Sequence, residues 1–303
     1  MDTRIRALLT GRGQICTTTQ LRAVDADEAT VARLVREGSL VRLRRGLFAA
    51  GPVWQAATPE RRLSLRTRAV LLDRPGAVAS HASAAVIHGL PLWGVATSTV
   101  DLVCTTPRRR VRSGLRLHPW PAGVSPTSTD GVPVVPLPVA IAQMAAECGS
   151  IPALVCLDRA LHEGAVTTGA VAEAGALLLG PRGRLRIESM IERSDPGCES
   201  VGETRTRALL IDLGLPVRTQ VTIRDGEGFV GRVDFLVGER VVVEFDGMLK
   251  YGGADGRRAL QSEKAREDRL RAAGYVVVRL VWADLDDPER VLDLVHRASR
   301  RAA

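Results

Sequence analysis

The sequence predicts a multidomain protein of mixed α and β structure, and three observations support that prediction. The chain has 303 residues, which is enough for two or three domains with hydrophobic cores of their own. Its 45% hydrophobic and 25% charged residues match an ordinary folded protein. Helical and strand-like periods alternate along the chain and divide it into three expected domains, residues 1–55, 56–180 and 181–303.

Several classes of protein are excluded by simple counts. No apolar run approaches the roughly 18 to 20 residues that span a bilayer, and the first twenty residues lack a signal-peptide pattern. The five cysteines are scattered without a C-x-x-C pair, so neither a disulfide framework nor a thiolate zinc site is indicated. We therefore expect a cytoplasmic protein that does not engage a membrane.

The charge is concentrated at one end of the chain. The formal net charge is +8, from 42 basic and 34 acidic residues. Residues 1–60 carry nine arginines against six acidic residues, and residues 61–120 carry ten against two. Residues 199–303 balance at eighteen of each sign. A basic N-terminal region favours a polyanionic partner, and we expect that partner to be DNA.

The first 55 residues predict three short helices followed by a basic hairpin. In the third helix, EATVARLVREG after the cap residue Asp27, we expect Ala29, Ala32, Leu34 and Val35 to point inward. The hairpin VRLRRGLF alternates apolar and arginine side chains and turns at an Arg-Gly pair. This order of elements is that of a winged helix-turn-helix.

In a winged helix the third helix enters the major groove and the wing contacts phosphates. The residues expected to contact DNA are therefore Thr30, Arg33, Arg36, Arg42, Arg44 and Arg45. The alternative is a small α+β domain whose arginine face is merely solvated.

The middle region alternates helices and strands. Helices are expected over residues 61–72 and 81–88 and across 136–179, and strands near 98–105 and 113–120. The strands would form a hairpin whose connection holds four arginines between residues 108 and 112, either contacting phosphate or simply solvated. His81, His88 and His118 lack the spacing of a metal site, so we expect them to be structural.

The first 180 residues resemble a known family through the segments RRGLFAAG, ASHASAAVIHGLPLWG, VDLVCTTP and VPVVPLPVAIAQMA. These segments are similar to the AbiEi-type antitoxins and transcriptional regulators common in actinobacteria. The resemblance implies DNA binding by the N-terminal module. For true antitoxins of this type it also implies autorepression of a toxin operon, with the cognate toxin as a partner.

Carboxylates interrupt apolar strands in the last domain. A helix starting near Glu199 would place Glu199 and Glu203 on one face, and three strands would follow it. Asp234 lies within the second strand, and Glu244 and Asp246 close the third. Carboxylates among Val and Phe are costly unless they are paired or bind a cation. We therefore predict a Mg²⁺ or Mn²⁺ site at Asp234 and Glu244.

That metal site depends on the register of a hairpin. A strict two-residue loop at residues 238–239 would place Asp234 opposite Val243 and turn Glu244 to the other face of the sheet. A loop of odd length, or a bulge, would place Asp234 opposite Glu244. Metal binding by this pair requires the second arrangement.

An amphipathic helix over residues 257–274 and a buried strand, YVVVRLVW, complete the order αβββαβ. This order, with ESVGETRTR, VDF, VEFDG, EKAREDRL and VVVRLVWADL, resembles the PD-(D/E)XK nuclease domains related to very-short-patch repair endonucleases. The resemblance implies that Asp234 and Glu244 ligate the metal, that Glu203 is a helix carboxylate of the site, and that Gln220 is its neighbour.

Asp246 departs from the family pattern, because it stands where the third motif has a lysine. We nevertheless expect Asp246 to be one of the catalytic residues. The charge-stabilising role would then pass to Lys250 or Lys264.

The sequence therefore predicts a DNA-binding protein whose C-terminal domain hydrolyses DNA phosphodiesters with Mg²⁺ or Mn²⁺. The competing hypothesis is an AbiEi-type regulator with an inert nuclease fold, in which the acids form salt bridges with Arg232, Arg266 and Arg269. RNA processing ranks last, because aromatic residues make up only 3% of the chain. A homodimer is expected by analogy with half-site readers and double-strand cutters.

Overall fold

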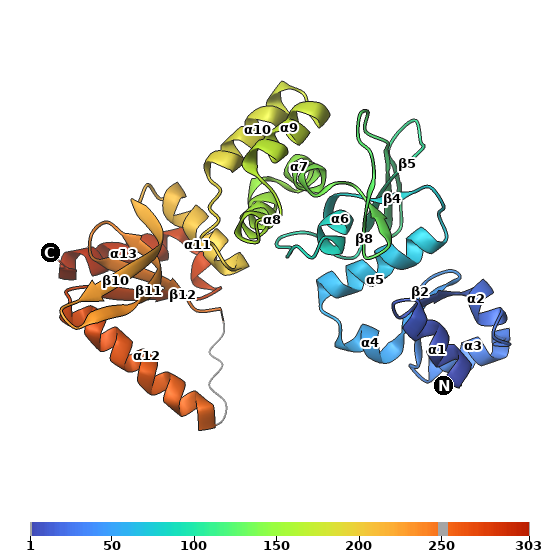
Figure 1. The fold of residues 1–303 in the computed structure, drawn as a ribbon, viewed down its shortest axis with the longest axis horizontal. Coiled ribbons are helices and arrows are strands. Elements are labelled where there is room, and N and C mark those ends of the chain that lie inside the picture. Colours follow the sequence, from blue (N-terminus) through green and yellow to red (C-terminus); the bar gives the residue numbers. More distant parts are fainter. Residues whose placement is uncertain (1, 248–253, 303) are drawn as a thin grey trace. The chain divides into compact units, whose positions relative to one another are not determined.

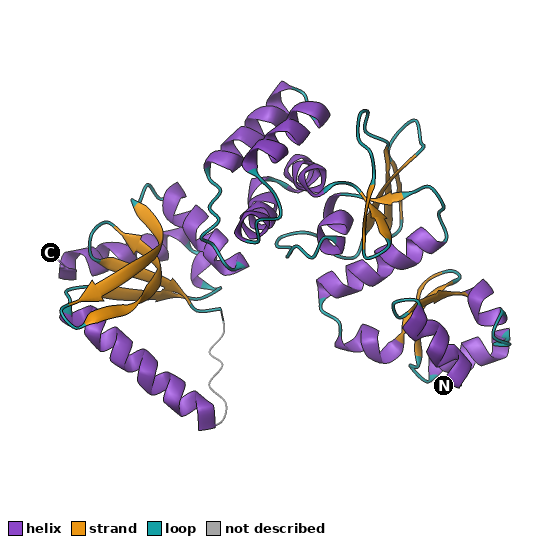
Figure 2. Cartoon of the chain, viewed as in Figure 1, coloured by secondary structure: helices purple, strands orange, loops and turns teal. Residues whose placement is uncertain are grey.

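The computed structural model describes residues 2–247 and 254–302 and divides the chain into two compact units (Figure 1). The first unit comprises Met1–Cys156 and Val166–Ser189, and the second comprises Leu157–Ala165 and Met190–Ala303. Each unit contains helices and its own β-sheet structure, so the chain has the multidomain α+β character that was predicted (Figure 2). A domain boundary near residue 55 stays a prediction.

The N-terminal part of the first unit contains the three predicted helices and the basic hairpin, with one additional strand before the second helix. In order, these elements are α1 (Thr3–Gly11), β1 (Ile15–Thr17), α2 (Thr18–Arg22), α3 (Glu28–Arg36), β2 (Leu40–Arg44) and β3 (Leu47–Ala50). Asp2, Thr17 and Asp27 cap the helices through their side chains, as expected for Asp and Thr at these positions. The strands form a sheet in the order β1-β3-β2.

Helix α3 buries a different face from the one predicted. Val31 and Leu34 are buried, whereas Ala29 and Ala32 are exposed. The prediction for the two alanines was wrong. The inward stripe follows the larger side chains at i and i+3, because they remove more apolar area from water.

The rest of the first unit surrounds a six-stranded sheet of order β6-β7-β5-β4-β9-β8. Its strands are β4 (Val78–Ala79), β5 (Val100–Cys104), β6 (Arg110–Arg112), β7 (Leu115–Pro119), β8 (Thr127–Thr129) and β9 (Val132–Val134). Its helices are α4 (Gly51–Ala56), α5 (Pro59–Leu72), α6 (His81–Ile87), α7 (Leu137–Cys148), α8 (Ser150–His162), α9 (Thr168–Leu178) and α10 (Pro181–Glu192). Helix α8 runs from the first unit into the second.

The predicted hairpin between β5 and β7 is wrong, because these strands pair in parallel. The basic connection itself forms β6, which pairs antiparallel with β7 across the turn at Ser113 and Gly114. Gly114 has a φ of +66°, a conformation that a tight turn readily uses at glycine. Since β6 occupies one edge of β7 as its hairpin partner, β7 meets β5 on its other edge in the parallel direction.

The second unit contains the predicted order αβββαβ. The elements are α11 (Val201–Asp212), β10 (Val217–Asp225), β11 (Gly228–Val237), β12 (Val241–Phe245), α12 (Ala254–Ala272) and β13 (Val276–Leu280). A 3₁₀ turn, η1 (Asp284–Asp286), and a final helix, α13 (Pro288–Ala302), follow. The sheet order is β10-β11-β12-β13, with only the last pair parallel.

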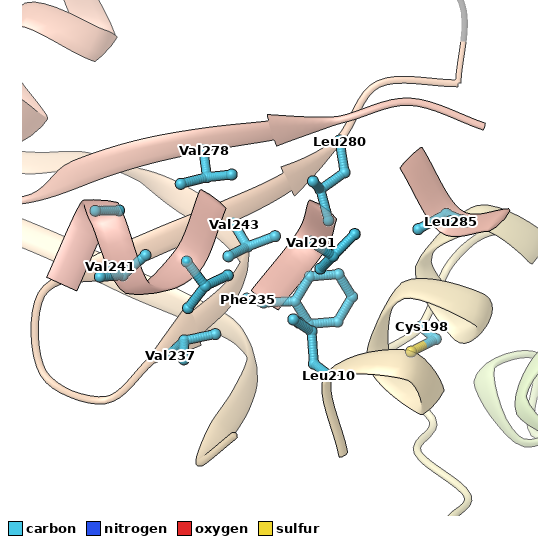
Figure 3. Packing of buried hydrophobic residues seen from close by; sticks show 12 residues of the cluster. Cys198, Leu210, Phe235, Val237, Val241, Val243, Val278, Leu280, Leu285 and Val291 are labelled. Atoms are coloured by element: carbon cyan, nitrogen blue, oxygen red, sulfur yellow. The ribbon is translucent and has the colours of Figure 1, made fainter. Parts of the chain in front are cut away.

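Both faces of this sheet are covered by apolar packing. On one face Phe235, Val243 and Val278 pack with Leu210 of α11 and Val291 of α13 (Figure 3). On the other face Val233, Leu236 and Val242 pack with Leu270 of α12. Leu236 and Val242 alternate with Phe235 and Val243, as the two-residue period of a strand requires, whereas Val233 joins the cluster opposite to that of Phe235. A polar side chain on these strands is therefore held in a fixed place by packing on both sides.

No helix within the described part of the chain is both long enough and apolar enough to cross a membrane.

Candidate functional site

The hairpin between β11 and β12 has the register that the metal site requires. Val237 pairs with Val241, Leu236 with Val242, and Phe235 with Val243, which leaves a three-residue loop. The paired stretch ends at Phe235 and Val243, and Asp234 and Glu244 are the next residues on the two strands. Extension of the same register would set them opposite each other. The loop therefore has the odd length that metal binding by this pair requires.

Three of the predicted acids line one pocket of about 410 Å³. The lining residues are Arg232, Asp234, Glu244, Phe245, Asp246, Glu263, Arg266 and Arg279. Strands β11, β12 and β13 and helix α12 supply the charged side chains. The pocket is thus built where the two strand carboxylates meet the basic face of α12 and β13.

Asp234 lies in this pocket without a salt bridge of its own, although the nearby charge of Arg266 acts on it. Its Oδ2 accepts the backbone N–H of Phe245 at 2.9 Å, and no salt bridge reaches it from any residue that the structure describes. Burial raises the pKa of Asp234 to about 6, and the negative charges of Glu203 and Glu244 add to that effect. An unneutralised acid in this position is a ready acceptor for a cation or a proton.

Glu244 is held by two arginines. Its Oε1 accepts from Nη2 of Arg266 at 2.7 Å, and its Oε2 lies 3.7 Å from Nε of Arg279. Both arginines also pair with Glu263. Glu244 therefore enters a network of alternating charges rather than standing alone.

The salt bridges expected for an inert site are present in part. Arg266 pairs with Glu244, and Arg232 pairs with Glu199. Arg269 instead binds Asp225, with Nη2 to Oδ1 at 2.7 Å. A metal ion would have to compete with Arg266 for the Glu244 carboxylate, so this pairing opposes metal binding.

Glu203 lies in the first turn of α11 and does not line the pocket, but its charge acts on Asp234. The Ser200 hydroxyl accepts the Glu203 N–H at 3.1 Å, which starts the helix at this point. Glu203 Oε2 in turn accepts from the Glu199 N–H at 3.0 Å and from Gln220 Nε2 at 3.2 Å. Glu203 and Gln220 are thus neighbours, as the family resemblance implied.

Two backbone features that sequence reasoning missed bring these groups together. Gly202 packs on the Phe245 ring so closely that a Cβ on it would lie 1.9 Å from Cε1. Gln220 has a φ of +53°, which is uncommon for a residue other than glycine and interrupts its pairing with β11. The glycine inside a helical pattern was the available signal, because such a residue commonly marks a close approach.

The predicted lysines do not line the described part of the pocket. Lys264 lies on α12 and is exposed, and Lys250 lies outside the described residues. Asp246 does line the pocket, and its N–H donates to the Leu280 carbonyl at 2.8 Å. Among the described lining residues, arginines supply the positive charge.

The predicted DNA-contacting residues lie on α3 and on the β2–β3 hairpin. Arg36, Arg42 and Arg45 are exposed, and Thr30 is partly exposed. Arg33 pairs with Glu37 at 3.1 Å, which ties its charge to its own helix.

Arg44 lines a basic pocket of about 410 Å³ in the first unit. The lining residues are Leu43, Arg44, Arg45, Arg66, Val70, Ser98, Val100, Ser113 and Gly114, which include no carboxylate. Arg44 is anchored by donating to the Ser113 carbonyl at 3.1 Å. Three arginines facing one cavity without an acid form a site suited to phosphate.

Arg66 of this pocket was missed by sequence reasoning. It stacks over the Trp54 ring at 4.8 Å and donates to the Thr97 carbonyl at 3.0 Å. Burial lowers the pKa of Arg66, and the charge of Arg62 adds to the effect. The sequence showed only one arginine among several on a helix, and nothing in its spacing pointed to the hairpin.

The whole chain was also compared with known proteins. No family model matches it. Two uncharacterized proteins from two strains of Mycobacterium tuberculosis are each 26% identical to it over 272 residues, which is 88% of this chain and 95% of theirs. The 272 aligned residues outnumber the residues of either unit, so the alignment includes parts of both.

Proposed function

We propose that this protein binds DNA through its basic first unit and that its second unit is a PD-(D/E)XK-type, metal-dependent DNA endonuclease. The observation that supports the proposal most is the odd register of the β11–β12 hairpin. That register supports a site in which Asp234 and Glu244, the next residue on each strand, line one pocket, with Asp234 making no salt bridge among the described residues. A purely structural pair of acids would be expected to have its charges matched.

The donor set suits a hard divalent cation. Asp234 and Glu244 offer carboxylate oxygens, the ligands that Mg²⁺ and Mn²⁺ prefer. When bound, such an ion would supply a Lewis acid that polarises the phosphodiester and acidifies a water. Arg266 and Arg279 present guanidinium groups in the same pocket, and these can hold a phosphate oxygen by charge-assisted hydrogen bonds.

Glu203 and Gln220 would serve as positioning residues. Their mutual hydrogen bond ties α11 to β10, and Glu203 adds negative charge to the surroundings of Asp234. That charge keeps the Asp234 proton affinity high until a cation arrives.

The first unit would supply most of the affinity for DNA. A winged helix-turn-helix over α1 to β3 would present α3 to the major groove, and Arg44, Arg45 and Arg66 would hold a backbone phosphate. Binding of this kind weakens steeply as salt rises, because each neutralised phosphate releases counterions.

A second function is favoured by a specific observation. Glu244 is already paired with Arg266 and Arg279, which is the arrangement expected of an inert nuclease fold. In that case the protein would be an AbiEi-type regulator that binds DNA without cutting it.

Nicking of supercoiled plasmid distinguishes the two functions. The full chain would be incubated with Mg²⁺, Mn²⁺ or EDTA, beside the variants Asp234→Asn and Glu244→Gln. Glu227→Gln is the matched control, because that acid lies on the adjacent hairpin with 85% of its side chain exposed and outside the pocket. Binding is followed by gel shift at fixed low salt.

The endonuclease proposal expects metal-dependent nicking by the wild type and by Glu227→Gln. It expects nicking to be lost in both pocket variants while gel shifts persist. Gel shifts without nicking in any metal would instead support the regulator.

A further inference from the structure

A second cluster of metal-ligating side chains lies in the first unit. His81 begins α6, Asp101 lies on β5 and His118 on β7. Each offers one ligand atom, the three atoms lie within 4.8 Å of one another, and all three residues are buried. Among the side chains that the structure describes, which exclude those of residues 248–261, no other group of His, Cys, Asp or Glu meets this condition.

The ligand atoms of the cluster lie near the spacing of a tetrahedral site, and small shifts of the two rings would be needed to reach it. His118 Nε2 lies 2.9 Å from Asp101 Oδ1, and the ligand–ligand edge of a zinc site with bonds near 2.0–2.1 Å is about 3.3 Å. The rings of His81 and His118 are stacked with centroids 4.0 Å apart. Nδ1 of His81 contacts the Ser80 hydroxyl at 3.0 Å, which leaves its Nε2 as the ring nitrogen free to ligate.

The carboxylate is oriented by a second layer of contacts. Arg116 donates from Nε and Nη2 to the two oxygens of Asp101, each at 2.7 Å. The parallel pairing of β5 with β7 sets Asp101 beside Arg116. The charge of Arg116 is in turn offset by Glu147, 3.9 Å away. Ligating carboxylates and histidines in metalloproteins are held by outer contacts of this type.

His81 is held in an uncommon backbone conformation. Its φ is +49°, and its N–H donates to the buried Oε1 of Gln143 at 3.0 Å. A residue other than glycine adopts this conformation at a cost that the surroundings must offset. In this conformation the His81 ring stacks on the His118 ring.

We propose that His81, Asp101 and His118 form a binding site for a first-row transition metal such as Zn²⁺. Two imidazoles and one carboxylate suit such an ion better than Mg²⁺, which prefers oxygen ligands alone. On binding, the ion takes the place of the proton between His118 Nε2 and Asp101 Oδ1, and that proton leaves to solvent. The bound ion links α6, β5 and β7. This site does not depend on the proposed nuclease function.

The charged side chains next to the cluster reach solvent. Arg116, which binds Asp101, and Glu147 are about a quarter exposed, at 23% and 24%, and Arg109, which pairs with Glu147, is 46% exposed. Movement of these side chains would admit an ion without unfolding the sheet.

The test is metal binding by the full chain. Wild type is stripped with chelator, dialysed against Zn²⁺ and analysed for bound metal, and we expect about one equivalent per chain that resists a second dialysis. His118→Gln should lose this equivalent. His88→Gln is the matched control, because His88 is a half-buried histidine of the same unit that bonds the Val135 carbonyl and lies outside the trio. Glu244→Gln should also keep it, which separates this site from the acidic pocket.

Co²⁺ provides a measurement that requires no variant. We expect the wild type bound to Co²⁺ to show the strong visible absorption of a four-coordinate site, and Zn²⁺ to abolish it. The proposal is overturned if the wild type retains no Zn²⁺ and shows no such absorption. It is also overturned if a folded His118→Gln variant, checked by circular dichroism, retains as much Zn²⁺ as the wild type.

Discussion

Asp101 in the first unit and Asp234 in the second are both strand carboxylates in apolar surroundings, and they differ in their partners. Burial alone would raise the pKa of Asp101, but hydrogen bonds from His118 and Arg116 more than offset it, so that pKa lies below its usual range. Asp234 accepts one backbone N–H, and burial raises its pKa to about 6. In the metal-free protein the charge of Asp101 is matched by His118 and Arg116, whereas Asp234 makes no salt bridge.

The comparison separates an acid whose charge is matched in the metal-free fold from one whose charge is not. A fully satisfied buried acid holds its neighbours in place and is costly to remove. An unsatisfied acid destabilises the fold and is retained when it performs a function. Substitutions at the two positions should therefore change stability in opposite directions.

The largest effect is expected from Asp101→Ala. Removing this carboxylate leaves the buried His118 and the partly exposed Arg116 without their acceptor, and losing one partner of a buried pair costs about 3–5 kcal/mol. Urea unfolding of the full chain, in EDTA so that bound metal plays no part, should show the transition of the first unit at lower denaturant. Unchanged unfolding would show that the cluster contributes little to the first unit.

The second-largest loss of stability is expected from Gly202→Ala, which tests the acidic pocket. The new Cβ would meet the Phe245 ring at 1.9 Å, so α11 must move away and carry Glu203 with it. Overpacking of this kind costs about 2–3 kcal/mol. Gly226→Ala, whose Cβ would meet nothing within 4 Å, is the control in thermal melts and in the nicking assay.

Asp234→Asn should stabilise the second unit at neutral pH. The folded pKa of about 6 exceeds the ordinary value of 3.8, so the folded state binds the proton more tightly and loses stability as pH rises from about 4 to 6. Asparagine can still accept the Phe245 N–H and carries no charge to desolvate. We expect a gain of about 1–2 kcal/mol at pH 7.5 and almost none at pH 4. Melting curves at the two pH values measure it, and a loss of stability at pH 7.5 would contradict the comparison.

The smallest effect is expected from Arg66→Gln in the basic pocket. Loss of one phosphate contact should weaken DNA binding about tenfold at low salt and reduce the slope of log K against log salt by about one. Arg61→Gln is the control, because Arg61 lies exposed on the same helix and outside the pocket. Equal effects of the two substitutions would indicate a diffuse charge contribution rather than a phosphate site.

Much of the element order could be predicted from the sequence, because periodicity and capping are local properties. The strands and helix around Asp234 and Glu244 form in the predicted order. The parallel pairing of β5 with β7 could not be predicted, since it depends on the connection itself becoming a strand. Local patterns carry no information about such competition for a sheet edge.

The two candidate sites also differ in whether local sequence patterns could predict them. Asp234 and Glu244 of the acidic pocket lie within one hairpin, so the sequence left only the length of the connecting loop undetermined. The histidine cluster was not, because His81, Asp101 and His118 come from three elements separated along the chain. Residue spacing reveals ligands on one element, and only the tertiary fold brings together ligands from several.

The three-residue loop at residues 238–240 has a consequence for how this protein can vary in evolution. Insertion or deletion of a single residue there changes an odd loop to an even one and exchanges the side chains that β12 presents to the two faces of the sheet. Glu244 would then leave the pocket, and the valines of β12 would each join the opposite cluster. Changes of two residues preserve the arrangement. Among relatives that keep the acidic pocket, loop length at this turn should therefore vary in steps of two.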